Sequence, residues 1–173
     1  RISMHTRAAD FFAELKKPES GRKSLPDLQP HLDEFEQRMK AGQYDQAAGV
    51  LLDISFDGLF TWGHLRLMAD LYESLQGKIS SPYLKAVSLG NLGIAYWSTG
   101  QVCNAIHCYK QALEIIRERE IATWILGNLG NCHYNLGEIA QAIKCHEQAL
   151  AIDREIGYRM GEATDFVNLG NCY

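Results

Sequence analysis

Cysteine and histidine side chains, which can bind a transition metal, stand close together at several places in this sequence. Cys103 and His107 are four residues apart, and three further pairs are adjacent: His107-Cys108, Cys132-His133 and Cys145-His146. Thiolate and imidazole groups are the usual ligands of zinc, and residues four apart share one face of a helix. One hypothesis is therefore a metal-dependent function, which predicts bound zinc.

A structural interpretation of the same residues is favoured by their place in a sequence repeat. Cys132 and Cys172 share one repeat position, and Cys108 and Cys145 share another. His133 and His146 stand where tyrosines are expected in the core. Because cysteine is among the most buried residue types, we expect these side chains to fill the core. No metal and no cofactor is predicted.

A second set of polar residues has the spacing of one helix face. Trp124, Asn128, Asn131 and Asn135 follow one another at intervals of four, three and four residues, which places them on one helix face. An asparagine amide both donates and accepts hydrogen bonds, so it can pair with a peptide main chain whatever the ligand's sequence. The alternative is that these amides bond to neighbouring helices and fix the packing of the repeat.

The elements that position these residues are specified by a repeated phrase. Leu-Gly-Asn-Leu-Gly occurs at 89–93 and 126–130, and Val-Asn-Leu-Gly occurs at 167–170. The phrases are 37 and then 40 residues apart. A period of this size is typical of solenoids built from helix pairs.

Each repeat is expected to contain two helices joined at a glycine. In the first, Leu89, Leu92, Gly93 and Tyr96 lie on one helix face, and Gly100 ends that helix. The same turn recurs upstream and downstream, because Gly42, Gly100 and Gly137 each precede a helix alanine by five residues. The second helix of the first repeat carries Ala105, Ile106, Tyr109, Ala112, Leu113 and Ile116 at helical spacing.

The pattern L-x-x-L-G-x-x-Y followed by A-x-x-x-Y resembles the tetratricopeptide (TPR) repeat. Leu89 stands where the pattern has tryptophan, and the closing proline is absent from both complete units. The resemblance implies an all-α fold, a right-handed TPR-like superhelical solenoid of antiparallel helix pairs, with degenerate helices at the N-terminus.

In TPR proteins the positions that these residues occupy line the concave groove, so the resemblance implies a partner that is a protein or peptide. The equivalent positions are Val87, Asn91, Ile94 and Ser98 in the first repeat and Thr164, Asn168 and Asn171 in the third. Gly90 and Gly127 stand where a carboxylate-clamp lysine would be, which disfavours an acidic chaperone-type ligand. The predicted peptide-binding residues are Asn91, Ile94, Trp124, Asn128, Asn131, Asn135, Asn168 and Asn171.

The repeat predicts five parts along the chain. Before the clear repeats we expect an amphipathic helix over about 1–16, then a linker that contains Pro18, Gly21, Pro26 and Pro30. The parts are an N-terminal helix and linker (1–30), a degenerate repeat with an extra helix (31–82), two TPR units (83–119 and 120–159) and the first helix of a truncated third unit (160–173).

The N-terminal region resembles a junction found in bacterial signal-transduction ATPases of the STAND class, where a winged-helix domain precedes a TPR sensor array. The resemblance rests on His-Thr-Arg-Ala-Ala-Asp-Phe-Phe at residues 5–12 and on the proline-bearing linker. It implies that this chain is the sensor or regulatory arm of a larger ATPase. At the other end, Phe166, Leu169 and Tyr173 lack a partner helix, so we expect truncation or self-association through the repeat end.

Composition and the lack of known motifs disfavour several classes of function. The 173 residues are 46% hydrophobic with a formal net charge of −4 and no basic block, which disfavours a nucleic-acid ligand. No apolar run approaches membrane-spanning length. Five cysteines without C-x-x-C spacing favour a reducing, cytoplasmic location. We recognise no nucleotide-binding or catalytic motif, so an enzyme is not predicted.

Overall fold

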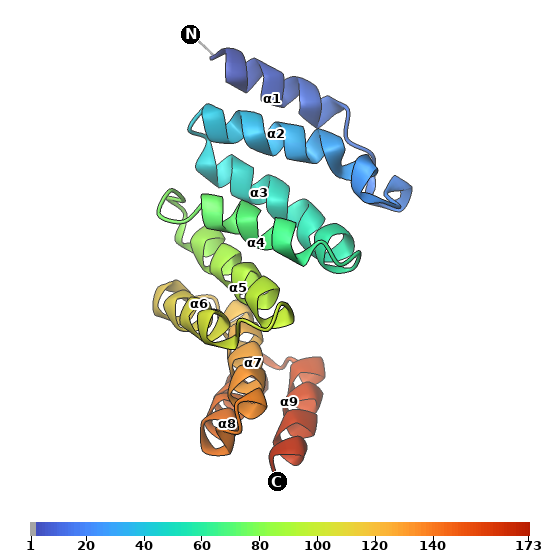
Figure 1. The fold of residues 1–173 in the computed structure, drawn as a ribbon. Helices are drawn as coiled ribbons and strands as arrows, with labels where there is room; N and C mark the ends of the chain where they lie inside the picture. The colour runs from blue at the N-terminus through green and yellow to red at the C-terminus, as the bar shows by residue number, and fades with distance from the viewer. Residues whose placement is uncertain (1–2) are drawn as a thin grey trace. The chain divides into compact units, whose positions relative to one another are not determined.

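The computed structural model describes residues 3–173, and all of its regular elements within that range are helical (Figure 1). The chain divides into two compact units, Arg1–Leu84 and Lys85–Tyr173. The predicted all-α, TPR-like fold of paired helices is confirmed. No helix among the described residues has both the length and the apolar character needed to cross a membrane.

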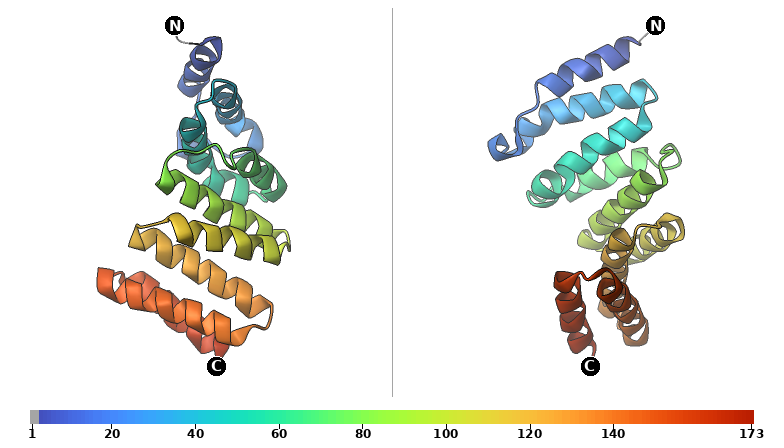
Figure 2. Two further views of the ribbon diagram at one scale, coloured as in Figure 1. Left: turned by 90° about the vertical axis from the view of Figure 1, so that its left-hand side faces the viewer. Right: turned by 180° about the vertical axis from the view of Figure 1, so that it is seen from behind.

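The first unit is a stack of neighbouring helices in which α1 packs on α2 and α2 packs on α3 (Figure 2). Ala47, Leu51 and Ile54 of α3 form part of its core. A further helix begins at Leu65 and ends before Gly77. The bounds are α1 (Met4–Glu14), α2 (Gln29–Lys40), α3 (Tyr44–Ile54) and α4 (Leu65–Ser74).

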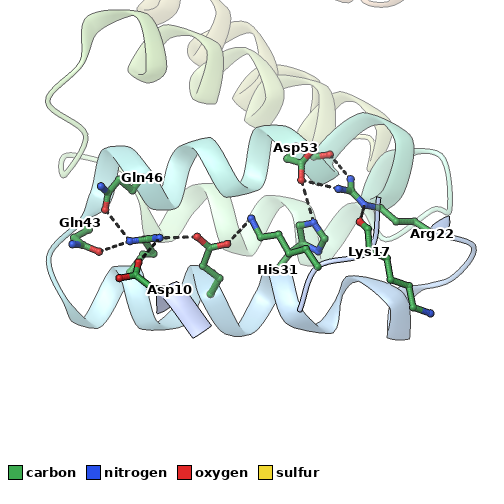
Figure 3. A network of polar contacts seen from close by, with 10 residues as sticks. Asp10, Lys17, Arg22, His31, Gln43, Gln46 and Asp53 are labelled. Carbon is green, nitrogen blue, oxygen red and sulfur yellow. Dashed lines mark hydrogen bonds and ion pairs between the residues drawn. The ribbon is translucent and has the colours of Figure 1, made fainter. Parts of the chain in front are cut away.

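A polar network attaches the predicted linker to α2 and α3 (Figure 3). Arg22 donates through Nη2 to Asp53 Oδ2 at 2.9 Å and through Nη1 to the Asp53 carbonyl at 3.1 Å. His31 of α2 is fully buried, with Nε2 3.1 Å from the same Asp53 Oδ2. Leu28 is also fully buried, so the linker residues contribute to the core of the first unit.

A six-residue π-helical segment, η3 (Ser55–Phe60), follows α3 and was not expected from the sequence. The Ser55 hydroxyl donates to the Leu51 carbonyl at 2.6 Å and lies 2.6 Å from the Tyr72 hydroxyl of α4. Gly58 fits closely under Leu28, because a Cβ atom there would lie 2.8 Å from Leu28 Cδ1. Contacts with α4 and with residues far away in sequence therefore accompany this irregular turn.

The second unit contains the clear repeats, and its helices are joined by tight turns. Gly100 and Gly137 adopt φ values of +80° and +75°, which glycine accommodates without the Cβ clash of other residues. At the end of the first unit, the Leu84 amide donates to Ser81 Oγ at 3.4 Å, which caps the helix that begins at Pro82. The helices are α5 (Pro82–Ser98, in this unit from Lys85), α6 (Val102–Ile115), α7 (Arg119–Asn135), α8 (Ile139–Ile156) and α9 (Arg159–Cys172).

The two helices of each repeat meet where a glycine receives an aromatic ring. A Cβ atom at Gly93 would lie 2.6 Å from Cε1 of Tyr109, and one at Gly130 would lie 2.5 Å from Cε1 of His146. Tyr109 and His146 are each 1% exposed. His146 therefore occupies the core position that tyrosine holds in the preceding repeat, as predicted.

The cysteines mostly occupy the helix cores. Cys108, Cys132 and Cys145 are buried, Cys172 is half-buried and Cys103 is exposed. Burial raises the pKa of Cys132 to about 11 and also raises the pKa of Cys145. Within residues 3–173 no group of three or more histidine, cysteine or acidic side chains is arranged to hold a metal ion.

Candidate functional site

The site is a groove of about 410 Å³ between α7 and α9, with its floor at the C-terminal end of α8. It lies within the second unit, and the three helices are neighbours in Figures 1 and 2. The first helices of two successive repeats form its walls. Its lining residues are Glu120, Thr123, Trp124, Gly127, Asn128, Asn131, Asp153, Tyr158, Gly161, Thr164, Asp165 and Asn168.

Four of the eight predicted peptide-binding residues meet in this groove. Trp124, Asn128 and Asn131 line it from α7, and Asn168 lines it from α9. All four side chains are partly exposed. The helical spacing of the stripe thus brings residues of two repeats to one surface.

The other four predicted residues lie elsewhere on the second unit. Asn91 and Ile94 are half-buried on α5, outside the lining of this groove. Asn135 and Asn171 are exposed at the C-terminal ends of α7 and α9, also outside it. The groove is therefore lined by only half of the predicted peptide-binding residues.

Asn128 combines a structural contact with a place in the groove. Its Nδ2 donates to the Trp124 carbonyl at 3.0 Å, which is a bond to the preceding turn of its own helix. This bond fixes the amide's orientation and uses one of its two N–H donors. The structural and the ligand-binding interpretations of this residue are therefore compatible.

Trp124 is held by a glycine of the preceding repeat. A Cβ atom at Gly90 of α5 would lie 2.5 Å from Cη2 and Cζ3 of the Trp124 ring. Gly127, one helical turn along α7, has open space at the corresponding position. Gly90, which stands where a carboxylate clamp would have lysine, therefore provides the space for the Trp124 ring.

Carboxyl groups at the groove floor were missed by the sequence interpretation. Asp153 of α8 and Asp165 of α9 are 2% and 4% exposed, and both line the groove. Asp153 Oδ1 and Asp165 Oδ2 are buried without a hydrogen-bond partner among the described residues. One available signal was that Asp165 stands at the repeat position of Ile125, which is fully buried.

The two carboxyls are shifted towards their protonated forms. Burial, reinforced by the charge of Asp153, raises the pKa of Asp165 to about 7. Burial also raises the pKa of Asp153, opposed by its hydrogen bond with Thr123 and supported by the charge of Glu162. Removing a carboxylate from water disfavours its ionised form, and a second acid nearby adds to the effect.

Gly161 on α9 permits the close approach of Asp153. A Cβ atom at this position would overlap Asp153 Oδ2 and would lie 2.5 Å from Cδ1 of Tyr158. The Asp153 carboxyl therefore lies directly against the α9 backbone.

Two stretches of the chain match known family models. Residues 86–119, which include most of α5 and all of α6, match the tetratricopeptide repeat. Residues 123–155, over α7 and α8, match it as well. A search of curated proteins found no match. The two matches support a tetratricopeptide-repeat domain in the second unit. The second match contributes α7 and the Asp153 end of α8 to the groove, whereas α9 follows both matched stretches.

Proposed function

We propose that this chain is a non-catalytic protein-interaction module, and that the groove between α7 and α9 binds a peptide or protein segment. Tetratricopeptide repeats generally mediate protein–protein interactions, and two such repeats match here. The observation that carries the proposal is the convergence of Trp124, Asn128, Asn131 and Asn168 on one groove.

The chemistry of the groove suits a peptide main chain. The amides of Asn131 and Asn168 come from opposite walls, and each can donate and accept. Trp124 and Tyr158 supply apolar surface for a side chain. A segment in this groove would be fixed by hydrogen bonds that read its backbone, while the rings contact its side chains.

Selection from a random-peptide phage library, followed by calorimetric titration of a selected peptide, tests the proposal. The double variant Asn128→Ala, Asn168→Ala should weaken binding by about tenfold or more, because two hydrogen bonds to the ligand are lost. Asn104→Ala is the matched control, since Asn104 is exposed on α6 and bonds to Gln101 at 3.0 Å. Unchanged affinity in the double variant would contradict the groove assignment.

We further propose that the module is the sensor or regulatory arm of a larger signalling ATPase in the cytoplasm. The support is the N-terminal sequence at residues 5–12 together with the proline-bearing segment that follows it. The complete reading frame tests this directly. A nucleotide-binding P-loop upstream is the expected finding, and an unrelated upstream domain would contradict it.

The alternative is a structural scaffold that self-associates through a repeat end. The outward face of α9 favours this alternative, because Met160, Phe166 and Val167 are 70%, 52% and 64% exposed. Exposed apolar patches commonly mark interaction surfaces. Sedimentation velocity over a wide concentration range should show reversible oligomers if this alternative holds, and a monomer throughout would exclude it.

A further inference from the structure

We propose that the floor of the α7–α9 groove is a subsite for a cationic side chain, arginine or lysine, of the bound segment. This inference rests on the proposed function, namely that the groove binds a peptide, and it adds the chemical class of one ligand residue. It departs from the sequence interpretation, which considered only main-chain recognition by the asparagines.

The first observation is that the floor carries buried acidic groups whose hydrogen bonding is incomplete. Asp153 and Asp165 are more than nine-tenths buried and come from two different helices. One oxygen of each lacks a partner in the described part of the chain. Buried polar groups in folded proteins are nearly always paired, so these oxygens call for a donor that residues 3–173 do not supply.

The basic side chains of α8 and α9 that stand closest in sequence to the two aspartates pair with another acid. Among the described residues that line the groove there is no lysine or arginine. The nearest basic groups along α8 and α9 are Arg154 and Arg159, which lie 3.9 and 3.3 Å from Glu162. The Arg154 guanidinium also lies over the Phe166 ring, 5.3 Å from its centroid. No lysine or arginine of the groove lining therefore pairs with the two aspartates, and a cation bound beside them would favour their ionised forms.

The rest of the lining is also suited to an organic cation. Trp124 and Tyr158 offer aromatic faces, which attract ammonium and guanidinium groups, tryptophan most strongly. Glu120, exposed at the start of α7, adds a third carboxyl to the lining. Aromatic rings beside carboxyls favour a cation on an apolar stem over a neutral or acidic side chain.

A bare metal ion fits the groove less well. No metal-holding group of three or more acidic, histidine or cysteine side chains is found in residues 3–173. The aromatic rings have no role in binding a hard cation, which takes oxygen ligands. An arginine or lysine side chain uses both the carboxyls and the rings.

Four acetylated and amidated peptides, Gly-Ser-X-Ser-Gly with X as arginine, lysine, citrulline or norleucine, test the subsite. The protein is labelled with 5-fluorotryptophan, and the Trp124 signal in the ¹⁹F NMR spectrum is assigned with Trp124→Phe. Trp62 and Trp97 lie outside the groove lining and serve as internal controls. In titrations followed by the Trp124 signal, the arginine peptide should bind at least about tenfold more tightly than the citrulline peptide, or the lysine peptide than the norleucine peptide.

Asp165→Asn should abolish most of this preference while leaving the neutral peptides unaffected. Glu155→Gln is the matched control, because Glu155 is exposed on α8, pairs with Arg119 at 2.5 Å and does not line the groove. Equal affinity for charged and neutral peptides, no response to any of them, or a preference that survives in Asp165→Asn would each overturn the subsite.

The two proposals fail in distinguishable ways. If phage-selected peptides bind in a manner that depends on Asn128 and Asn168 but show no need for a basic residue, the cationic subsite is wrong and the peptide groove stands. If neither alanine substitution nor Asp165→Asn affects any bound peptide, the groove assignment itself is wrong.

Discussion

Asp165 of α9 and Asp153 of α8 place two buried carboxyls at the floor of one groove, and the charge of Asp153 helps burial to raise the pKa of Asp165 to about 7. At Asp165 the repeat thus has an acid where the preceding unit has the buried Ile125. This departure from the repeat pattern affects both the pH dependence of stability and the ligand that the groove floor would accept.

Asp165→Asn should stabilise the protein above neutral pH. The pKa of Asp165 rises from 3.8 to about 7 on folding, so between these values the folded state binds more protons than the unfolded state. Stability then falls as pH rises through that window and levels off above it. The amide cannot ionise, so the free energy of unfolding of the variant should exceed that of the wild type by on the order of a few kcal/mol at pH 8, and by little at pH 4. Urea unfolding at several pH values measures this.

The surroundings of Asp165 define the control for that measurement. Asp153 faces it from α8, with Glu120 on α7, Glu162 on its own helix and the Glu162 partners Arg154 and Arg159 nearby. Asp153 also has a raised pKa, so the free energy of unfolding of Asp165→Asn should still fall with rising pH, but less steeply than in the wild type. Glu155→Gln should retain the wild-type profile. An Asp165→Asn profile parallel to the wild type would contradict the assigned shift.

His31 should give the first unit the opposite pH dependence. Burial, with the charges of Arg22 and Lys16, lowers the pKa of His31 to about 4, against the opposing charge of Asp53. The unfolded state therefore binds more protons between about 4 and 6.5, and stability falls as pH drops through that window. His31→Gln should flatten this part of the profile. Amide hydrogen exchange in α2 and α3 at pH 4.5 and 7 measures this pH dependence. An unchanged pH response in the variant would contradict the role of His31.

Much of the fold follows from periodicity, and the differences have physical causes. The turn glycines, the paired helices and the placing of Tyr109 and His146 follow from spacings that any helix imposes. The π-helical turn at Ser55–Phe60 does not, because it accompanies contacts with the distant Leu28 and Tyr72. The linker likewise contains prolines yet packs closely, through the contacts of Arg22 with Asp53.

Helical spacing and the repeat predicted part of the site. Trp124, Asn128 and Asn131 follow one another at helical spacing, and Asn168 stands at the repeat position of Asn128, so the sequence pointed to one surface. Asp153 joins them from the end of a second helix, and its position is set by the packing of α8 against both α7 and α9. Its partner Asp165 carried a local signal, as an acid at a core position.

Gly130→Ala and Gly127→Ala should differ sharply in stability, although both lie on α7. A Cβ atom at Gly130 would lie 2.5 Å from the His146 ring, so the buried ring must shift at a cost of about 1–3 kcal/mol. Gly127 has open space, and alanine there should gain roughly 0.5–1 kcal/mol of helix stability. Thermal unfolding distinguishes the two. Equal effects would show that His146 does not pack on Gly130.

Alkylation should separate the cysteines by their burial. Iodoacetamide at pH 8 should label exposed Cys103 first and Cys132 last, because Cys132 is 1% exposed and its pKa is raised to about 11. Mass spectrometry of the digest gives the rate at each site, and labelling in urea provides the reference in which all five react. Comparable rates at Cys103 and Cys132 in the folded protein would contradict the core-filling role.

NMR mapping of a phage-selected peptide on the ¹⁵N-labelled protein shows whether the α7–α9 groove binds a peptide segment. The side-chain amides of Asn128, Asn131 and Asn168 and the Trp124 indole N–H report on the groove itself. The expected result is that these four groups show the largest shifts and that the shifts saturate together. Saturating shifts confined to α1–α4, or to the outward face of α9 around Phe166 and Val167, would contradict it.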